Sequence, residues 1–422
     1  MKIALLILFS LLLSAPAFSQ GQWIRQQTPV TSTLTHIVFI DTLNGWAAGD
    51  SGKIIHTTNG GTNWQVQVVH NDLPFDDLFF INDSTGWALA NDYILGTYIF
   101  STTDAGSNWN FSRFPDDTHF YSTIFFNTLN SGFLAGNEGR ILKTFDGGNN
   151  WSQCSVDSSL YYRYPIKKLK FFNDRIGSAT GGAFDIAGVI WQTTNGGLNW
   201  KAYGVGGEPI FKVKYKDSLN ILAVGGDHEF GASQVLSTNG GSVWNYSLLN
   251  IFGTGYSIEF RNPSDYWIAL GFSQNLAHST NAGVNWTAFS SPDSTALFDM
   301  IFKTSRSGWC CGEKGRIYKF NYDYVGINNL SSFVPEGFFL SQNFPNPFNP
   351  STKIKFSLPA SGFVKLEVYN VLGKKVKSLA DENLKAGSYE VTFDASELSS
   401  GVYYYTLQSG NFIQTKKMLL LK

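Results

Sequence analysis

The phrase Ser/Thr-x-Asp/Asn-x-Gly-x-x-Trp occurs six times along the chain, and its copies are spaced by 42 to 49 residues. The copies end at Trp64, Trp109, Trp151, Trp200, Trp244 and Trp286. A repeat of about 40 to 50 residues that is rich in β-forming residues is typical of a β-propeller, in which each unit is one four-stranded blade. The repeat therefore predicts an all-β fold built from such blades.

The repeat units indicate seven blades, although the phrase occurs only six times. Seven segments fill the first-strand slot, from THIVFID (35–41) to DMIFKTS (299–305). The seventh unit supplies three strands and then stops at Phe320, without a Gly-Gly turn or a Trp. The segment WIRQQTP, which begins at Trp23, would supply its fourth strand and remove two exposed sheet edges. We therefore expect a seven-bladed propeller over residues 20–321, closed by pairing of its N- and C-terminal strands.

The repeated phrase is interpreted as turn chemistry and not as a ligand site used six times. An Asp or Asn side chain accepts backbone N–H bonds across a tight turn, Gly adopts a positive φ without steric cost, and Trp buries a large ring. The residues predicted to have these structural roles are Asn59, Gly61, Trp64, Asp104, Gly106, Trp109, Asp146, Gly148, Trp151, Asn195, Gly197, Trp200, Asn239, Gly241, Trp244, Asn281, Gly283 and Trp286.

The N-terminus predicts export. Residues 1–19 contain a basic Lys2, an apolar run over 3–13 and small residues before a predicted cleavage site between Ser19 and Gln20, as in a secretory signal peptide. The apolar run is too short to span a bilayer of about 30 Å, so we expect no transmembrane segment. The formal net charge of −1 provides no basic field for a nucleic-acid partner.

The fuller unit NGWAAGDSGKIIHTTNGGTNW (44–64) resembles the repeat of the Ycf48/Hcf136 family and of related BNR-type propellers, and the phrase within it is the Asp-box. The resemblance covers residues 23–320. It implies the propeller fold, whereas photosystem assembly is not implied for an exported chain.

The tail differs from the propeller. Its alternating segments predict a small Ig-like β-sandwich over 338–422, after a linker over 322–337. It resembles the type A sorting domain of the type IX (Por) secretion system through NFPNPFNP (343–350), VYNVLG (368–373), GVY (401–403) and Lys417–Met418. The resemblance implies the type IX machinery as a partner and passage through the periplasm to a secreted or surface-attached location.

No catalytic constellation is recognised, so we expect no enzyme, no cofactor and no metal site. Asp-boxes also occur in sialidases, but those enzymes need three arginines on a substrate carboxylate, and the eight arginines here complete no such set. The segment GDHEFG (226–231) is interpreted as a solvated loop. A module that binds or scaffolds a protein or glycan is the favoured function, and a glycan-directed, sialidase-like hydrolase is the alternative.

Unequal loops suggest where a partner docks. In a propeller, the connections between second and third strands share one face with the connections between units. On that face the segments 90–97, 181–188 and 225–232 are longer than their equivalents, and the connection 152–168 adds aromatic residues and an arginine, which are enriched at binding hot spots. The predicted partner-binding residues are Tyr162, Arg163, Phe184, Asp185 and His228. The alternative is that these loops merely cover the axis.

Overall fold

The computed structural model describes residues 22–68, 73–116, 118–157, 160–321, 327–331, 333–395 and 398–422. The predicted signal peptide and its Ser19–Gln20 cleavage site lie outside the described residues. The chain divides into two compact units, one over Trp23–Phe320 and one that includes Asn321–Lys422. Among the described residues, no helix is long and apolar enough to cross a membrane.

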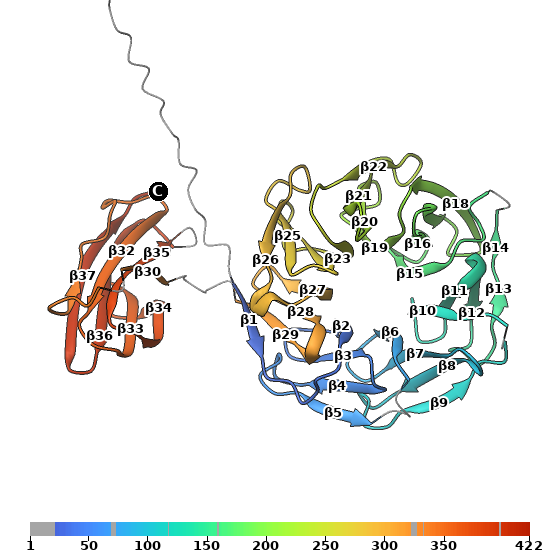
Figure 1. Cartoon of the computed structure of the whole chain (residues 1–422), viewed down its shortest axis with the longest axis horizontal. Helices are drawn as coiled ribbons and strands as arrows, with labels where there is room; N and C mark the ends of the chain where they lie inside the picture. Colours follow the sequence, from blue (N-terminus) through green and yellow to red (C-terminus); the bar gives the residue numbers. More distant parts are fainter. Residues whose placement is uncertain are drawn as a thin grey trace, which may run out of the picture. The chain divides into compact units, whose positions relative to one another are not determined.

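The first unit consists of β-sheets arranged around a common axis (Figure 1). Three sheets comprise β2 (Leu34–Phe39), β3 (Gly45–Gly49), β4 (Lys53–Thr57) and β5 (Gln65–Val68); β6 (Phe75–Phe80), β7 (Gly86–Asp92), β8 (Gly96–Thr102) and β9 (Asn110–Arg113); and β10 (Tyr121–Phe126), β11 (Gly132–Gly136), β12 (Ile141–Thr144) and β13 (Ser152–Gln153).

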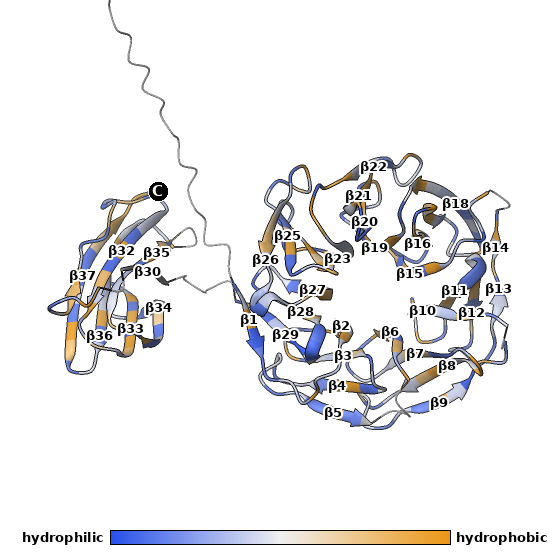
Figure 2. Ribbon diagram, in the orientation of Figure 1, coloured by the Kyte–Doolittle hydropathy of each residue, from blue (hydrophilic) through white to orange (hydrophobic). Residues whose placement is uncertain are grey.

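Three further sheets follow in the same order. They comprise β15 (Ile166–Phe171), β16 (Gly177–Ala183), β17 (Ala187–Thr193) and β18 (Asn199–Gly206), with β14 (Ser155–Val156) added outside β18; β19 (Ile210–Tyr215), β20 (Ile221–Asp227), β21 (Gly231–Ser237) and β22 (Asn245–Leu248); and β23 (Thr254–Phe260), β24 (Tyr266–Gly271), β25 (Asn275–Ser279) and β26 (Thr287–Ser290). The outer strand β9 is largely hydrophilic (Figure 2), and all four of its residues are exposed.

One further sheet combines both ends of this unit. Its strand order is β1-β29-β28-β27, where β1 is Gln22–Gln26, β27 is Leu297–Thr304, β28 is Ser307–Gly312 and β29 is Ile317–Asn321. Single turns of 3-10 helix, η1 (Asn137–Gly139), η2 (Pro292–Ser294) and η3 (Glu313–Gly315), lie in connections between strands. A strand from the start of the unit is therefore the neighbour of its last strand.

The six Asp-box turns have the same hydrogen bonds. In each, the Ser or Thr hydroxyl accepts the N–H of the Gly four residues later, over N–O distances of 2.9 to 3.0 Å. The Asp or Asn side chain accepts a second N–H, four residues further along from itself, at 2.9 to 3.1 Å. These glycines have φ between 79° and 95°, which favours Gly. The turns are held by local contacts of the repeated phrase.

Aromatic rings pack between neighbouring sheets. Trp46 of β3 stacks on Phe80 of β6 with ring centroids 3.7 Å apart, and Trp87 of β7 stacks on Phe126 of β10 at 3.8 Å. The same contact joins the last sheet to the first, because Trp309 of β28 stacks on Phe39 of β2 at 3.7 Å. Burial of such rings is a main contribution to the core of this unit.

The innermost strands share an irregularity that places polar residues around the axis. Each innermost strand skips one residue in its pairing with the next strand, and one polar residue follows directly after the skip. This occurs in β2, β6, β10, β15, β19, β23 and β27. These seven residues, which we call the axial ring, are His36, Asp77, Thr123, Lys168, Lys212, Ser257 and Asp299. A β-bulge re-aims the side chain that follows it, so the shift repeats with the blade.

The second unit contains two four-stranded sheets. Their orders are β30-β35-β32-β31 and β34-β33-β36-β37, formed by β30 (Ile327–Ser331), β31 (Phe339–Leu340), β32 (Ser351–Leu358), β33 (Gly362–Asn370), β34 (Lys375–Leu384), β35 (Gly387–Asp394), β36 (Gly401–Ser409) and β37 (Phe412–Leu420). Both sheets contribute to one core, in which Ile354, Leu366, Val391 and Tyr405 are fully buried.

The predicted linker is wrong in one respect. Residues 327–331 lie within the segment 322–337, yet β30 pairs with β35 of the second unit. The pairing satisfies backbone groups that β35 would otherwise expose at the edge of its sheet. The folded part of the tail therefore begins before residue 338.

The Asp-box tryptophans differ in burial, which predicts different costs of their removal. Trp200 is 2 % exposed, whereas Trp151 in the same slot is half-buried. We expect Trp200→Ala to lower the free energy of unfolding by about 3–5 kcal/mol and Trp151→Ala by about 1–3 kcal/mol. The second cost is smaller because the half-buried ring of Trp151 removes less apolar surface from water on folding. Urea unfolding of the two variants measures the difference. Equal costs would contradict this account of the repeated tryptophan.

Candidate functional site

The three longer connections on the predicted docking face are hairpins whose strand pairing continues almost to their tips. The ladders continue to the pairs Asp92–Gly96 in β7–β8, Ala183–Ala187 in β16–β17 and Asp227–Gly231 in β20–β21. Aspartates close two of the turns, because Asp92 Oδ1 accepts the N–H of Ile94 at 2.8 Å and Asp227 Oδ1 accepts that of Phe230 at 2.6 Å. The extra residues thus lengthen the strands.

The hairpin tips expose large apolar side chains. Tyr93 is 79 % and Ile94 90 % exposed on the first tip, Ile186 is 64 % exposed on the second and Phe230 54 % on the third. We call the face that carries these three tips the hairpin face. Grouped exposed apolar side chains are typical of interaction sites.

The connection 152–168 brings its aromatic residues to the neighbouring blade. Its strand β14 pairs in parallel with β18, and residues 158–159 lie outside the described residues. Arg163 is exposed, and its Nε donates to the Tyr162 hydroxyl at 2.6 Å. Gly139, with φ +64°, permits close approach, since a Cβ there would lie 1.6 Å from the Tyr162 carbonyl oxygen. Tyr162 and Arg163 therefore form a pair beside η1.

The structure brings together only some of the predicted partner-binding residues. Phe184 and His228 belong to one chain of neighbouring rings, with Phe184–Phe211 at 6.1 Å, Phe211–Tyr256 at 4.4 Å, Tyr256–Phe272 at 6.1 Å and Phe272–His228 at 6.5 Å. Within the described part of the chain, no hydrogen bond, ion pair or ring contact joins Tyr162 or Arg163 to Phe184, Asp185 or His228. The predicted residues form two separate groups.

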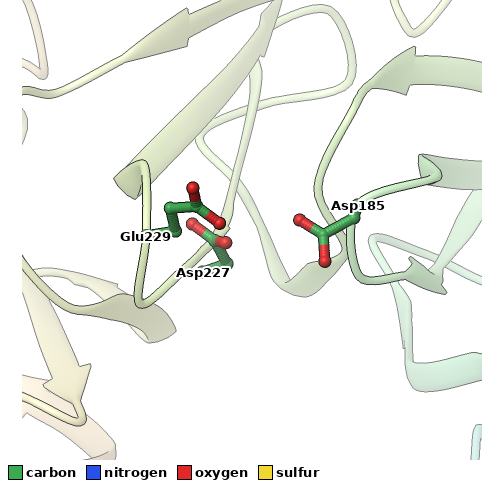
Figure 3. A group of neighbouring side chains, drawn as sticks. All are labelled: Asp185, Asp227 and Glu229. Carbon is green, nitrogen blue, oxygen red and sulfur yellow. The ribbon is translucent and has the colours of Figure 1, made fainter.

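Acidic side chains from two hairpins meet at this face. Carboxylate oxygens of Asp185, Asp227 and Glu229 lie within 4.8 Å of one another (Figure 3). Glu208 adjoins them, because the Asp185 N–H donates to its Oε2 at 3.1 Å. Burial, and then the charges of Asp227, Asp185 and Glu229, raise the pKa of Glu208. Such oxygens are those that Ca²⁺ takes as ligands, and they equally attract a basic side chain.

Sequence reasoning missed this cluster for two reasons. Asp227 was placed in a solvated loop, but its residue is only 2 % exposed because it ends strand β20. Asp185 and Glu229 are 44 positions apart, and nothing in either segment predicts that they meet. The available signal was that both segments occupy the same slot of neighbouring repeats.

A cavity of about 350 Å³ opens at the axis on the hairpin face. Asp50 and Pro74, which belong to connections on this face, line its outer part. The residues just before the axial ring line its wall, namely Thr35, Asp76, Ser122, Lys167, Phe211, Tyr256 and Phe298. One side of the wall is polar and the other is aromatic, so the mouth is able to bind a ligand with both kinds of surface.

Arginine is absent from the described residues that line this cavity, so no arginine trio of the sialidase kind lies at the mouth. The nearest arrangement to a catalytic pair lies elsewhere. Asp116 Oδ2 is 2.9 Å from His119 Nδ1, and Arg140 Nη1 is 3.3 Å from His119 Nε2. Both ring nitrogens of His119 therefore have a protein partner, so neither is available to accept a proton from a ligand as a general base.

Two family models match the chain. The model described as photosynthesis system II assembly factor YCF48 matches residues 15–117, and the secretion system C-terminal sorting domain matches residues 342–421. The photosystem II assembly lipoprotein Ycf48 of Picosynechococcus sp. is 25 % identical over 334 residues, which cover 76 % of this chain and 93 % of that protein.

Solved structures agree in fold. The structure titled "YCF48 bound to D1 peptide" has a TM-score of 0.58 and 19 % identity, and the match covers 71 % of this chain and 96 % of that one. YCF48 from Cyanidioschyzon merolae has a TM-score of 0.59 and 18 % identity, with 71 % and 98 % covered. The chain combines a Ycf48-like propeller with a secretion sorting domain.

A half-buried acid at the mouth of the Ycf48-like propeller predicts a pH dependence of stability. Burial raises the pKa of Asp76 from 3.8 to about 6, although Asn91 donates to its Oδ2 at 2.9 Å. Because the folded-state pKa lies above the unfolded one, the contribution of this group is favourable below about pH 4 and is lost as the pH rises through 6.

We therefore expect Asp76→Asn to raise the free energy of unfolding by about 1–2 kcal/mol at pH 7 and to leave it nearly unchanged at pH 4. Urea unfolding at both pH values measures this. Asp50→Asn, which changes an exposed carboxylate at the same mouth, is the matched control and should show no such difference. A loss of stability at pH 7 in Asp76→Asn would contradict the assignment.

Proposed function

We propose that the Ycf48-like propeller binds a segment of a partner protein on its hairpin face, after export by its tail. The observation that carries this proposal is the set of strand-paired hairpins with exposed apolar tips beside the axial mouth. A disordered segment of a partner has apolar side chains for such tips and backbone groups for the polar part of the wall. The solved YCF48 structure with a bound D1 peptide supports peptide binding by this fold, for that protein.

Ring closure would make the hairpin face a fixed platform. In the proposal, the sheet β1-β29-β28-β27 and the Trp309–Phe39 stacking close a seven-bladed ring. A closed ring has no free edge strand at its junction, so the tips keep their spacing when a partner binds. We also propose that the two sheets of the tail form an Ig-like β-sandwich.

The sorting domain implies secretion or display at the cell surface through the outer membrane, and interaction with the type IX machinery. We therefore propose that the partner is met outside the cell or at its surface. We assign no enzymatic activity to the propeller. The sialidase-like alternative requires a cluster of arginines, which the lining of the axial mouth does not favour.

The docking proposal predicts that binding depends on the hairpin tips. The double variant Phe184→Ala/Ile186→Ala should lose at least tenfold in partner capture by the full mature chain, because both side chains are exposed on one tip. Leu198→Ala/Val243→Ala removes exposed apolar side chains from two Asp-box turns and is the matched control, expected to bind as wild type. Arg163→Ala tests the Tyr162–Arg163 pair separately. Capture that is unchanged in the tip variant, with its fold intact, would overturn the proposal.

The delivery proposal predicts that the tail is required for export and not for folding of the propeller. Deleting residues 322–422 removes the second unit together with β30, and leaves β29 beside β1. The truncated chain should accumulate in the periplasm with its cooperative thermal transition intact. Fractionation and calorimetry measure these outcomes. Its appearance at the cell surface would contradict export by the sorting domain.

A further inference from the structure

A second cavity opens on the opposite side of the axial ring. It has a volume of about 270 Å³ and is lined by residues that follow the ring in the innermost strands. Lys168, Lys212 and Asp299 of the ring line both this cavity and the one on the hairpin face, so the ring separates the two. The second cavity lies toward the face that carries the Asp-box turns, because the innermost strands run from the hairpin face to that face.

The charges around this second cavity do not balance. Five ammonium groups, those of Lys168, Lys170, Lys212, Lys214 and Lys303, face three carboxylates, those of Asp77, Glu259 and Asp299. Ion pairs join Lys168 to Asp77, Lys212 to Asp299 and Lys214 to Glu259. Two ammonium groups therefore remain in excess.

The excess charges belong to Lys170 and Lys303. Among the described residues, neither ammonium group makes a hydrogen bond or ion pair with the protein, and both residues are exposed to solvent. Lys170 Nζ lies 5.5 Å from the centroid of the Phe125 ring. Crowding by surrounding protein atoms, and then the charge of Lys214, lower the pKa of Lys170 to about 8 although the residue is exposed to solvent, and the charge of Glu259 opposes this shift only in part.

The rest of the wall is apolar. Val38, Phe79, Phe125 and Ile301 line it at the level just beyond the axial ring, and Phe302 lies further along β27. Phe79 and Phe125 form a ring pair with centroids 5.0 Å apart, so they present a continuous surface. A volume near 270 Å³ suits a body about as large as one phenyl ring with a short chain.

From these features we propose that the second cavity binds an organic carboxylate, whose anionic group meets Lys170 and Lys303 and whose apolar body lies against Phe79, Phe125 and Ile301. An anion supplies counter-charges to two exposed ammonium groups that line the cavity, while its apolar body leaves water for the apolar part of the wall. The site lies on the opposite face from the proposed docking of a partner, so it goes beyond that function and stands if that function fails.

The test compares an acid with its neutral counterpart. For the full mature chain, isothermal titration calorimetry should show 3-phenylpropanoate binding at least tenfold more tightly than 3-phenylpropanamide, which has the same body without the charge. Lys170→Met should weaken binding of the acid at least tenfold. Lys216→Met removes an exposed ammonium group from the same face outside the cavity and should bind as wild type. Lys303→Met provides a second variant, so a folding defect in one leaves the test intact.

Further measurements distinguish the source of the carboxylate. The peptide acetyl-Ala-Ala-Phe with a free C-terminus is compared with its C-terminal amide. Binding of the free acid and of this peptide, but not of its amide, supports the site with a protein C-terminus as ligand. Binding of the free acid alone supports it with a small molecule. Equal affinities for acid and amide, absence of binding by both acids, or unchanged affinity in both lysine variants would overturn the proposal.

Discussion

The fold of the propeller depends on ion pairs that cross its axis. Lys212 Nζ lies 2.8 Å from Asp299 Oδ1, and Asp299 also accepts the N–H of Ile37 at 3.1 Å, so one carboxylate joins β19, β27 and β2. Asp77 pairs with Lys168 and accepts the Thr123 hydroxyl at 2.7 Å. Burial by itself would raise the pKa of Asp299, but the charges of Lys212 and Lys168, together with the hydrogen bond from Lys212, outweigh it and lower that pKa. Removing one partner leaves a buried charge uncompensated, so these contacts fix how the blades meet.

The axial ring and the Asp-box turns stabilise the blades in different ways. Each turn is held within about ten residues of chain, so a blade forms its outer hairpin from its own sequence. Contacts of the ring join residues 42 to 262 positions apart, so it forms only when blades have assembled. Between these levels, the stacking of Trp46 on Phe80 and of Trp309 on Phe39 packs each blade on the next. Local turns therefore define the unit, and long-range charges define the ring.

This difference explains what the sequence could and could not predict. The Asp-box roles were predictable because Thr57, Asn59 and Gly61 interact with each other within one phrase. The acidic cluster and the axial ring were not, because a single sequence contains no signal that pairs Asp185 with Glu229 or Lys212 with Asp299. The linker was assigned by its composition, and composition does not reveal that β30 completes a sheet through backbone bonds alone. The docking residues were chosen by loop length, which located the hairpins but not the separation of Arg163 from Phe184.

The axial ring also determines what the two mouths can do. A channel without it would be one continuous space, in which a ligand at one mouth would meet the charges of the other. Because Lys168, Lys212 and Asp299 form the partition, substitutions at Phe211 or Tyr256 alter the lining of the hairpin mouth and not the lining around Lys170. His36, whose pKa is lowered to about 4 by burial and then by Lys168, adds no positive charge to the partition near neutral pH. The pairs that hold the blades together thus separate an aromatic, partly acidic mouth from a cationic one, and each mouth is free to take a ligand of its own chemistry.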